Sequence, residues 1–299
     1  MTSSQHELRA LPFYLVNVFA ETITAGNPLA VVCLDAPLSA PSMQALAKQM
    51  NLSETVFIER DPSQPEADPK LHIYTPSVCL PFAGYPILGA AFVLQQQGDA
   101  RETLVLQAEA GPVEVSLTPE CVWLKTPQPP TSRVADLSMA EAAAMLGLEV
   151  SDIAAQPLWV STGSEQLLIQ LASKEAVLRA KPDPILFETG AYLRPGRTVA
   201  YIWYEAEALA TVRMFTGQNG AVVEDPGTGS ACANLGGLQV LRGDTDFAWR
   251  LEQGECVQRL NVLHLAVKPG PVDAAPSAAE IWVGGAVLPV GEGVLHWPG

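Results

Sequence analysis

The sequence predicts an α+β protein with two similar domains, in each of which a curled β-sheet wraps around one buried helix. The chain has 299 residues, which suits two domains of ordinary size. Most apolar residues fall in short runs typical of β-strands. Two segments are instead small and apolar at nearly every position, and a helix of that kind is tolerated only when other structure encloses it.

These two segments, 84–99 and 229–244, have the same length, and each begins with glycine and ends in Gly-Asp. They begin 145 residues apart, one in each predicted domain. Pro86 is expected at the first helical position of the first segment, and the glycines near the ends are typical of helix C-termini. The two helix N-termini are expected to direct free backbone N–H groups toward a cleft between the domains.

The remaining elements follow from hydrophobic patterns in chain order. Strands are predicted at 13–19, 29–34, 54–58, 71–74, 158–160, 166–171, 199–204, 208–215, 262–267, 281–283 and 286–290. Further helices are predicted at 41–50, 139–148 and 175–180. A turn at Gly26-Asn27-Pro28 is expected to join the first two strands.

A change of composition near residue 127 predicts the domain boundary. Prolines at the start of 127–133 favour a stiff, extended linker, because proline fixes φ. We therefore expect an N-terminal domain over 1–126 and a C-terminal domain over 134–285. A C-terminal strand within 286–299 could return to the first domain.

The charge balance excludes several classes of partner. The chain has 17 basic and 32 acidic residues, which give a net charge of −15. Without a cluster of lysines and arginines, such a chain repels nucleic acid and anionic membrane surfaces. It also lacks an apolar run of about 20 residues and the basic-then-apolar order of a cleavable signal. We expect a cytoplasmic protein that binds neither nucleic acid nor membranes.

The cysteine and histidine positions indicate no metal site. Five cysteines are widely spaced and form no C-x-x-C pair, and four histidines show no spacing typical of metal ligands. The sequence therefore predicts neither a disulfide framework nor a metal centre.

The string Glu224-Asp225-Pro226-Gly227-Thr228-Gly229-Ser230 is the sharpest candidate site. It combines two carboxylates with a glycine-rich turn at the start of a predicted helix. The backbone amides and hydroxyl groups there could hold a carboxylate or a developing oxyanion. The same string is also typical of an ordinary capped helix, so spacing alone leaves both interpretations open.

Two residues of the predicted N-terminal domain are further candidates. Glu54 lies at the edge of an apolar strand, and a partly desolvated carboxylate has the raised pKa that a base removing a C–H proton needs. A solvent-facing strand residue is the other interpretation of Glu54. Tyr85 lies at the start of the first apolar helix, where it could donate a hydrogen bond to substrate or form part of the wall.

Taken together, the motifs resemble the phenazine-biosynthesis PhzF family, which shares its fold with diaminopimelate epimerase. The resemblance covers about residues 12 to 290, and the combination of motifs is more specific than any one of them. The motifs, in chain order, are Gly26-Asn27-Pro28, Ser53-Glu54-Thr55, Pro81-Phe82-Ala83-Gly84-Tyr85-Pro86, Thr162-Gly163, Arg213-Met214-Phe215 and Glu224-Asp225-Pro226-Gly227-Thr228-Gly229-Ser230-Ala231.

The resemblance implies two pseudo-symmetric domains, each a β half-barrel around a central helix, with a cofactor-free site between them. It implies isomerase or epimerase chemistry, in which Glu54 takes a proton from carbon and helps return it elsewhere. Asp225 and Ser230 match site residues of the family, and the adjacent turn matches the one that holds the substrate carboxylate. Relatives of this fold often pair, so a homodimer is compatible with the chain.

Three departures from the family and its fold relatives bear on the reaction. Tyr85 stands where the family usually has histidine, and a phenol exchanges protons less readily than imidazole at neutral pH. Cys79 stands where a glutamate often precedes Pro-Phe. Ala83 and Pro226 occupy the places that hold two cysteines in diaminopimelate epimerase-like enzymes, so racemisation by a pair of thiols is excluded.

The leading hypothesis is a cofactor-independent isomerase or epimerase of a small carboxylated metabolite. Glu54 and Asp225 are the expected catalytic residues. The expected substrate-binding residues are Gly84, Tyr85, Gly227, Thr228, Gly229 and Ser230. The alternative is a metabolite- or partner-binding protein of the same fold whose catalysis is impaired along with the loss of the histidine.

Overall fold

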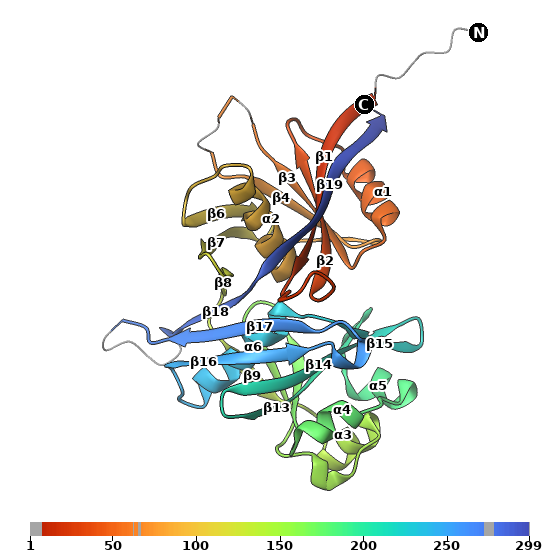
Figure 1. Ribbon diagram of the computed structural model, residues 1–299. Coiled ribbons are helices and arrows are strands. Elements are labelled where there is room, and N and C mark those ends of the chain that lie inside the picture. Colours follow the sequence, from red (N-terminus) through yellow and green to blue (C-terminus); the bar gives the residue numbers. More distant parts are fainter. Residues whose placement is uncertain (1–7, 62, 65–66, 272–277, 299) are drawn as a thin grey trace, which may run out of the picture. The chain divides into compact units, whose positions relative to one another are not determined.

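The computed structural model describes residues 8–61, 63–64, 67–271 and 278–298 (Figure 1). The chain divides into two compact units. The first comprises Met1–Ile23, Asn27–Leu124 and Ala286–Gly299, and the second comprises Thr24–Gly26 and Lys125–Gly285. None of the helices among the described residues is long and apolar enough to cross a membrane.

The first unit has a curled sheet and two helices in the part that the structure describes. Its strands are β1 (Leu8–Val18), β2 (Asn27–Leu34), β3 (Glu54–Glu59), β4 (Lys70–Tyr74), β5 (Cys79–Leu80), β6 (Thr103–Ala108), β7 (Gly111–Leu117), β8 (Val122–Lys125) and β19 (Val287–Pro298). Its helices are α1 (Ala40–Met50) and α2 (Gly84–Gln96). The first and last described strands lie side by side, with β1 antiparallel to β19 from Leu8 opposite Pro298 to Val18 opposite Val287 (Figure 1).

The second unit has a sheet and four α-helices among its described residues. Its strands are β9 (Thr131–Val134), β10 (Leu158–Ser161), β11 (Gln166–Gln170), β12 (Tyr192–Arg194), β13 (Arg197–Ala206), β14 (Leu209–Gln218), β15 (Ala221–Asp225), β16 (Phe247–Gln253), β17 (Asn261–Lys268) and β18 (Glu280–Gly285). Its helices are α3 (Met139–Leu146), α4 (Lys174–Arg179), α5 (Pro184–Gly190) and α6 (Gly229–Leu241), with short 3-10 turns at η1 (Val150–Asp152) and η2 (Glu255–Val257).

The two sheets have the same order of parallel and antiparallel pairs. In the first unit the order is β19, β1, β2, β3, β4, β6, β7, β8, and only β2–β3 and β4–β6 are parallel. In the second it is β9, β10, β11, β13, β14, β16, β17, β18, and only β11–β13 and β14–β16 are parallel. A short strand, β5 or β15, precedes the apolar helix in each unit. The prediction of two similar α+β domains is therefore confirmed.

The apolar helices α2 and α6 are the buried helices that the sequence predicts. Glycines permit their close contact with the sheets. A Cβ at Gly89 would lie 2.3 Å from Leu29 Cδ2, and one at Gly236 would lie 2.7 Å from Leu265 Cδ1. The N-terminus of each helix has no side-chain cap, and the C-terminus of each is followed by a glycine with positive φ, Gly98 or Gly243. The apolar sequence of each helix is thus explained by contact with its own sheet.

Two details differ from the predictions. Helix α2 begins at Gly84, so Pro86 occupies its third position and not its first. The end of the predicted linker 127–133 belongs to a sheet, because Thr131–Val134 forms β9 and pairs with β10. Prolines 127, 129 and 130 all precede that strand, and from Thr131 onward no proline prevents ladder hydrogen bonds.

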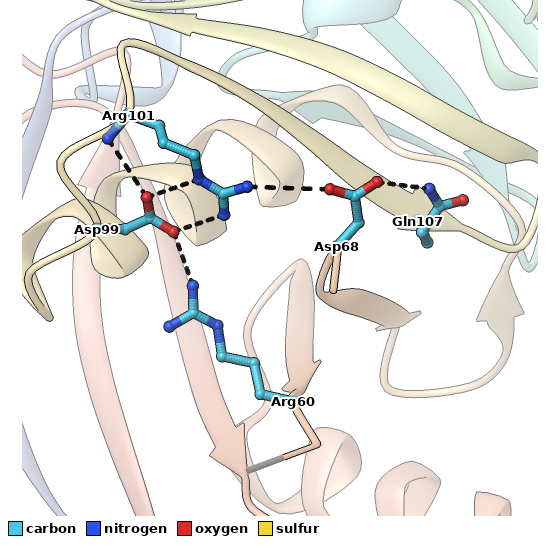
Figure 2. A network of polar contacts seen from close by, with 5 residues as sticks. All are labelled: Arg60, Asp68, Asp99, Arg101 and Gln107. Atoms are coloured by element: carbon cyan, nitrogen blue, oxygen red, sulfur yellow. Dashed lines mark hydrogen bonds and ion pairs between the residues drawn. The ribbon is translucent and has the colours of Figure 1, made fainter. Parts of the chain in front are cut away.

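A network of charges holds the end of α2 in place (Figure 2). Asp99, whose side chain is 8% exposed, accepts hydrogen bonds from Arg101 and from Arg60 Nη2 at 2.8 Å. The hydrogen bonds and charge of Arg101, with a smaller contribution from the charge of Arg60, lower the Asp99 pKa to about 2, and burial opposes this shift. Asp68 extends the network by accepting from Gln107 Nε2 at 3.2 Å. The aspartate of this Gly-Asp ending therefore has a structural role.

We expect Gly89→Ala to lower the free energy of unfolding by about 1 to 2 kcal/mol, because the methyl group would displace the buried Leu29 side chain of β2 and crowd Val16 and Val18 by more than the helix preference of alanine offsets. Gly84→Ala is the matched control, since a Cβ there meets nothing within 4 Å. Alanine also favours the helix, so the control should be neutral or slightly more stable. Chemical denaturation of both variants tests this, and equal midpoints would contradict the packing argument.

Candidate active site

The turn from β15 into α6 collects five of the predicted site residues in one place. Strand β15 ends at Asp225, and α6 begins at Gly229 after Thr228. The Asp225 carboxylate accepts hydrogen bonds from the Thr228 hydroxyl and from the Gly227 backbone N–H. Because the Thr228 hydroxyl is used in this way, it does not cap the helix. The helix therefore presents its positive end without a capping side chain.

Gln253, the last residue of β16, forms hydrogen bonds that hold this turn in place. The side chain of Gln253, a residue that is 1% exposed, donates to the Asp225 carbonyl at 2.8 Å and to the Thr228 hydroxyl at 3.0 Å. Its Oε1 accepts from the Thr228 backbone N–H at 3.2 Å. Asn261 packs against the same turn, where a Cβ at Gly227 would come within 2.4 Å of its Oδ1. Glycine is therefore required at position 227 by close contact.

The two adjacent carboxylates, Glu224 and Asp225, have different roles. Glu224 forms an ion pair with Arg213 at 2.7 Å, and both side chains are less than a tenth exposed. Arg213 also donates to the carbonyls of Val177 and Ala180, which ties β14 to the end of α4. Such a pair, fully engaged in hydrogen bonds, is structural. Asp225 takes no part in this ion pair and instead accepts hydrogen bonds within its own turn.

The pKa of Asp225 is raised to about 6. Burial is the main cause, the neighbouring Glu224 charge adds to it, and the hydrogen bonds from Thr228 and Gly227 oppose it. A carboxyl group with this pKa changes protonation close to neutral pH, as a group that shares or relays protons must.

Ser230, the second residue of α6, completes the set on this turn. Its hydroxyl oxygen accepts a hydrogen bond from Gln166 Nε2 at 3.0 Å. Gln166 belongs to the buried strand β11 and is 1% exposed. The sequence motifs include Ser230 but neither Gln166 nor Gln253, because an isolated glutamine belongs to no motif.

The other three predicted site residues belong to the first unit. Glu54 is the first residue of β3 and is partly buried, with its Oε2 atom inaccessible to solvent. Gly84 and Tyr85 are the first two residues of α2, and Tyr85 is 6% exposed. Tyr85 is thus enclosed at the N-terminus of its helix. Glu54 is not the fully solvent-facing strand residue that its pattern also allowed.

The cysteines near these elements are not poised for proton transfer. Cys232 lies within α6 with no exposed surface, and burial raises the pKa of its thiol well above the usual range. Cys79 is exposed, and its thiol pKa is also raised. Within the described part of the chain, no group of three or more histidine, cysteine or acidic side chains could hold a metal ion.

We expect Asp225→Asn to increase stability at pH 7 to 8 by about 1 to 2 kcal/mol, because it removes a buried charge. The Asp225 pKa is higher in the native state than in the unfolded chain, so protonation of Asp225 favours the native state. This contribution is fully present below about pH 4 and is lost as the pH rises through about 6. The gain from the asparagine should therefore vanish below pH 4.

Thermal and denaturant unfolding across this pH range measures the effect. Glu224→Gln is the neighbouring control and should destabilise the protein, because it leaves Arg213 buried without its partner. A loss of stability in Asp225→Asn at pH 8 would contradict the assignment of an unfavourable buried charge.

Comparisons with known proteins agree with the architecture and the motifs. An uncharacterized isomerase of Pasteurella multocida is 44% identical over 286 residues, which cover 96% of this chain and 94% of the relative. A trans-2,3-dihydro-3-hydroxyanthranilate isomerase of Pseudomonas aeruginosa is 32% identical, over 75% of this chain and 77% of its own.

The crystal structure of a Bacillus anthracis phenazine biosynthesis protein of the PhzF family matches with a TM-score of 0.82. That match has 20% identity and covers 96% of this chain and 99% of the other, so it bears on the fold alone. The sequence profile of the PhzC-PhzF family, described as phenazine biosynthesis-like protein, matches residues 16–293. The chain therefore belongs to the phenazine biosynthesis-like PhzC-PhzF family of isomerases.

Proposed function

We propose that this protein is a cofactor-independent isomerase that shifts a proton between carbon atoms of a small carboxylated metabolite. The proposal is supported by the relative from Pseudomonas aeruginosa, which is named for an isomerisation of a cyclic amino carboxylate. A substrate of the same chemical class, an unsaturated ring or chain bearing a carboxylate, suits the motifs of this chain.

The main support for the proposal is the environment of Asp225. Its pKa of about 6 allows it to hold or release a proton near neutral pH, and Glu224 beside it is occupied by Arg213. The turn that follows Asp225 leads into a helix without a side-chain cap. A carboxylate bound at such a helix start is favoured by the N–H groups and the helix dipole. Gly227, Thr228, Gly229 and Ser230 are proposed to bind it there.

Glu54 is proposed as the general base and acid. It would remove a proton from carbon, and its protonated form would return the proton to another carbon of the same substrate. No net oxidation or loss of atoms accompanies this allylic shift. Positioned acid–base catalysis contributes about 10² to 10⁴ in rate, so stabilisation of the enolate-like intermediate must supply much of the remainder.

Asp225 is proposed to orient the substrate or to share the transferred proton. Gly84 and Tyr85 are proposed to contact the substrate from the start of α2. Tyr85 would donate a hydrogen bond, since a phenol keeps its proton at neutral pH.

We expect Glu54→Gln to abolish solvent-deuterium incorporation into trans-2,3-dihydro-3-hydroxyanthranilate in D2O, because an amide cannot accept the carbon-bound proton. Mass spectrometry of the recovered compound measures the incorporation. Glu59→Gln is the matched control at the other end of β3, where Glu59 pairs with His72 and Lys70, and it should retain incorporation. Undiminished incorporation in Glu54→Gln would refute the catalytic assignment.

We expect Tyr85→His to lower deuterium exchange, because the buried phenol belongs to a working site and the shorter imidazole would lose its contact with substrate. The same assay measures this, with thermal unfolding as the check on folding. A large increase in exchange would instead support the alternative function, a binding protein whose catalysis is impaired by the tyrosine.

A further inference from the structure

A chain of buried amide groups leads from the β-sheet of the second unit to Ser230. Asn234, on α6, has no exposed surface, and Gln166, on β11, is 1% exposed. Asn234 Nδ2 donates to Gln166 Oε1, and Gln166 Nε2 donates to the Ser230 hydroxyl oxygen at 3.0 Å. All three residues belong to one compact unit, so their mutual geometry is set by one sheet and its helix.

Backbone groups fix the orientation of Asn234. The Thr162 backbone N–H, which can only donate, lies 2.8 Å from Asn234 Oδ1. The carbonyls of Val160 and Ser164, which can only accept, lie 2.8 and 2.7 Å from Asn234 Nδ2. Rotating the amide by 180° would place donor against donor and acceptor against acceptor. The Asn234 amide therefore has a single favourable orientation.

The orientation of Gln166 follows from that of Asn234. Its Oε1 must face Asn234 Nδ2, so its Nε2 must face the hydroxyls of Ser230 and Ser164. The two N–H groups of Asn234 Nδ2 are shared among the carbonyls of Val160 and Ser164 and the Gln166 Oε1. The reverse orientation of Gln166 would place two NH2 groups, which can only donate, against each other in a buried place. Gln166 thus acts as a fixed donor toward Ser230.

A hydroxyl that accepts from a fixed donor must direct its own proton elsewhere. Ser230 lies at the second position of α6, beside the turn that begins at Asp225. Its O–H is consequently kept available as a donor at the start of the helix, next to the backbone N–H groups that favour an anion. Without Gln166 the hydroxyl could rotate and donate to the protein.

We propose that Gln166 is a positioning residue that orients the Ser230 hydroxyl as a hydrogen-bond donor to the substrate carboxylate, and that Asn234 fixes Gln166 in the required orientation. This inference deepens the proposed function and rests on its assignment of Ser230 to the carboxylate. Gln166 acts through Ser230 and has no contact of its own with the substrate.

The test is a double-mutant cycle on ligand binding. Anthranilate serves as a stable aminocarboxylate probe, and its Kd is measured by isothermal titration calorimetry. Gln166→Met, which keeps the volume and removes the donor, should weaken binding about 10- to 30-fold, because the Ser230 hydroxyl is then no longer directed at the carboxylate. Ser230→Ala should do the same, because it removes the hydrogen bond from that hydroxyl to a charged group. The double variant should be within about twofold of either single variant, because both remove the same interaction.

A second substitution replaces the hydrogen-bond donor of Gln166 toward Ser230 with an acceptor, instead of removing it. Gln166→Glu can still accept from Asn234, but its other oxygen would accept the Ser230 proton and turn the hydroxyl away from the ligand. It should weaken anthranilate binding at least as much as Gln166→Met. Gln170→Met is the matched control on the same strand, where Gln170 contacts Arg242 at 3.3 Å, and it should change Kd by less than twofold.

If the fold-loss of affinity in the double variant equalled the product of the two single losses, the proposal would be overturned, because a merely structural Gln166 would act independently of Ser230. Native-like binding by Gln166→Met would also overturn it. So would equal affinity of the unsubstituted protein for anthranilate and the neutral anthranilamide. The proposed proton shift is judged separately: if Glu54→Gln retained deuterium exchange while the cycle showed coupling, the isomerase mechanism would fail and the role of Gln166 would stand.

Discussion

Each unit must enclose a helix that is apolar on nearly every face, and the rest of the architecture follows from this constraint. The close approach of α2 to β2, and of α6 to β17, depends on glycines at the contact points. Close packing of this kind leaves little freedom for the helix to slide or rotate. A short strand, β5 or β15, leads into each helix, so the helix start is fixed relative to the edge of the sheet.

The fixed helix start of the second unit explains why Asp225 has its unusual environment. The Thr228 hydroxyl, which could cap α6, instead donates to Asp225, and the buried Gln253 holds both residues. The arrangement places a carboxyl group where ionisation is unfavourable and leaves the helix without a side-chain cap. Both features reduce stability, and both are typical of sites where binding or catalysis determines the sequence. Glu224, one residue earlier, shows the contrasting case of a carboxylate that is fully satisfied by Arg213.

The sequence predicts the two buried helices because their signal, small apolar residues between glycines, is local and strong. It also predicts the turn from Asp225 to Ser230, since the motif is contiguous. Strands β6, β7 and β16 are among those absent from the predictions, because polar residues interrupt their apolar positions, even though β6 and β7 pair as neighbouring segments of the chain. The common strand order of the two units depends on those strands, so it could not be derived from residue patterns.

The glutamines of the site were missed for a different reason. Gln166 and Gln253 each lie on a strand whose pattern gives no sign of function, and their roles depend on contacts with residues more than 20 positions away. Asn234 offered a weak signal, as a polar residue within an apolar helix. Spacing could not show that its amide bridges three elements, because the partners come from β10, the following loop and β11.

The Ser230 hydroxyl accepts its hydrogen bond from a neutral amide, and this fits the proton sharing proposed for Asp225. A lysine or arginine beside the turn would attract an anionic ligand more strongly, but it would also stabilise the ionised form of Asp225 and lower its pKa. The group would then hold no proton near neutral pH. The proposed chain of amide dipoles would orient a hydroxyl donor without adding charge, which is compatible with the Asp225 pKa of about 6 that burial produces. In the proposed function, carboxylate binding and proton sharing therefore coexist within one turn of the chain.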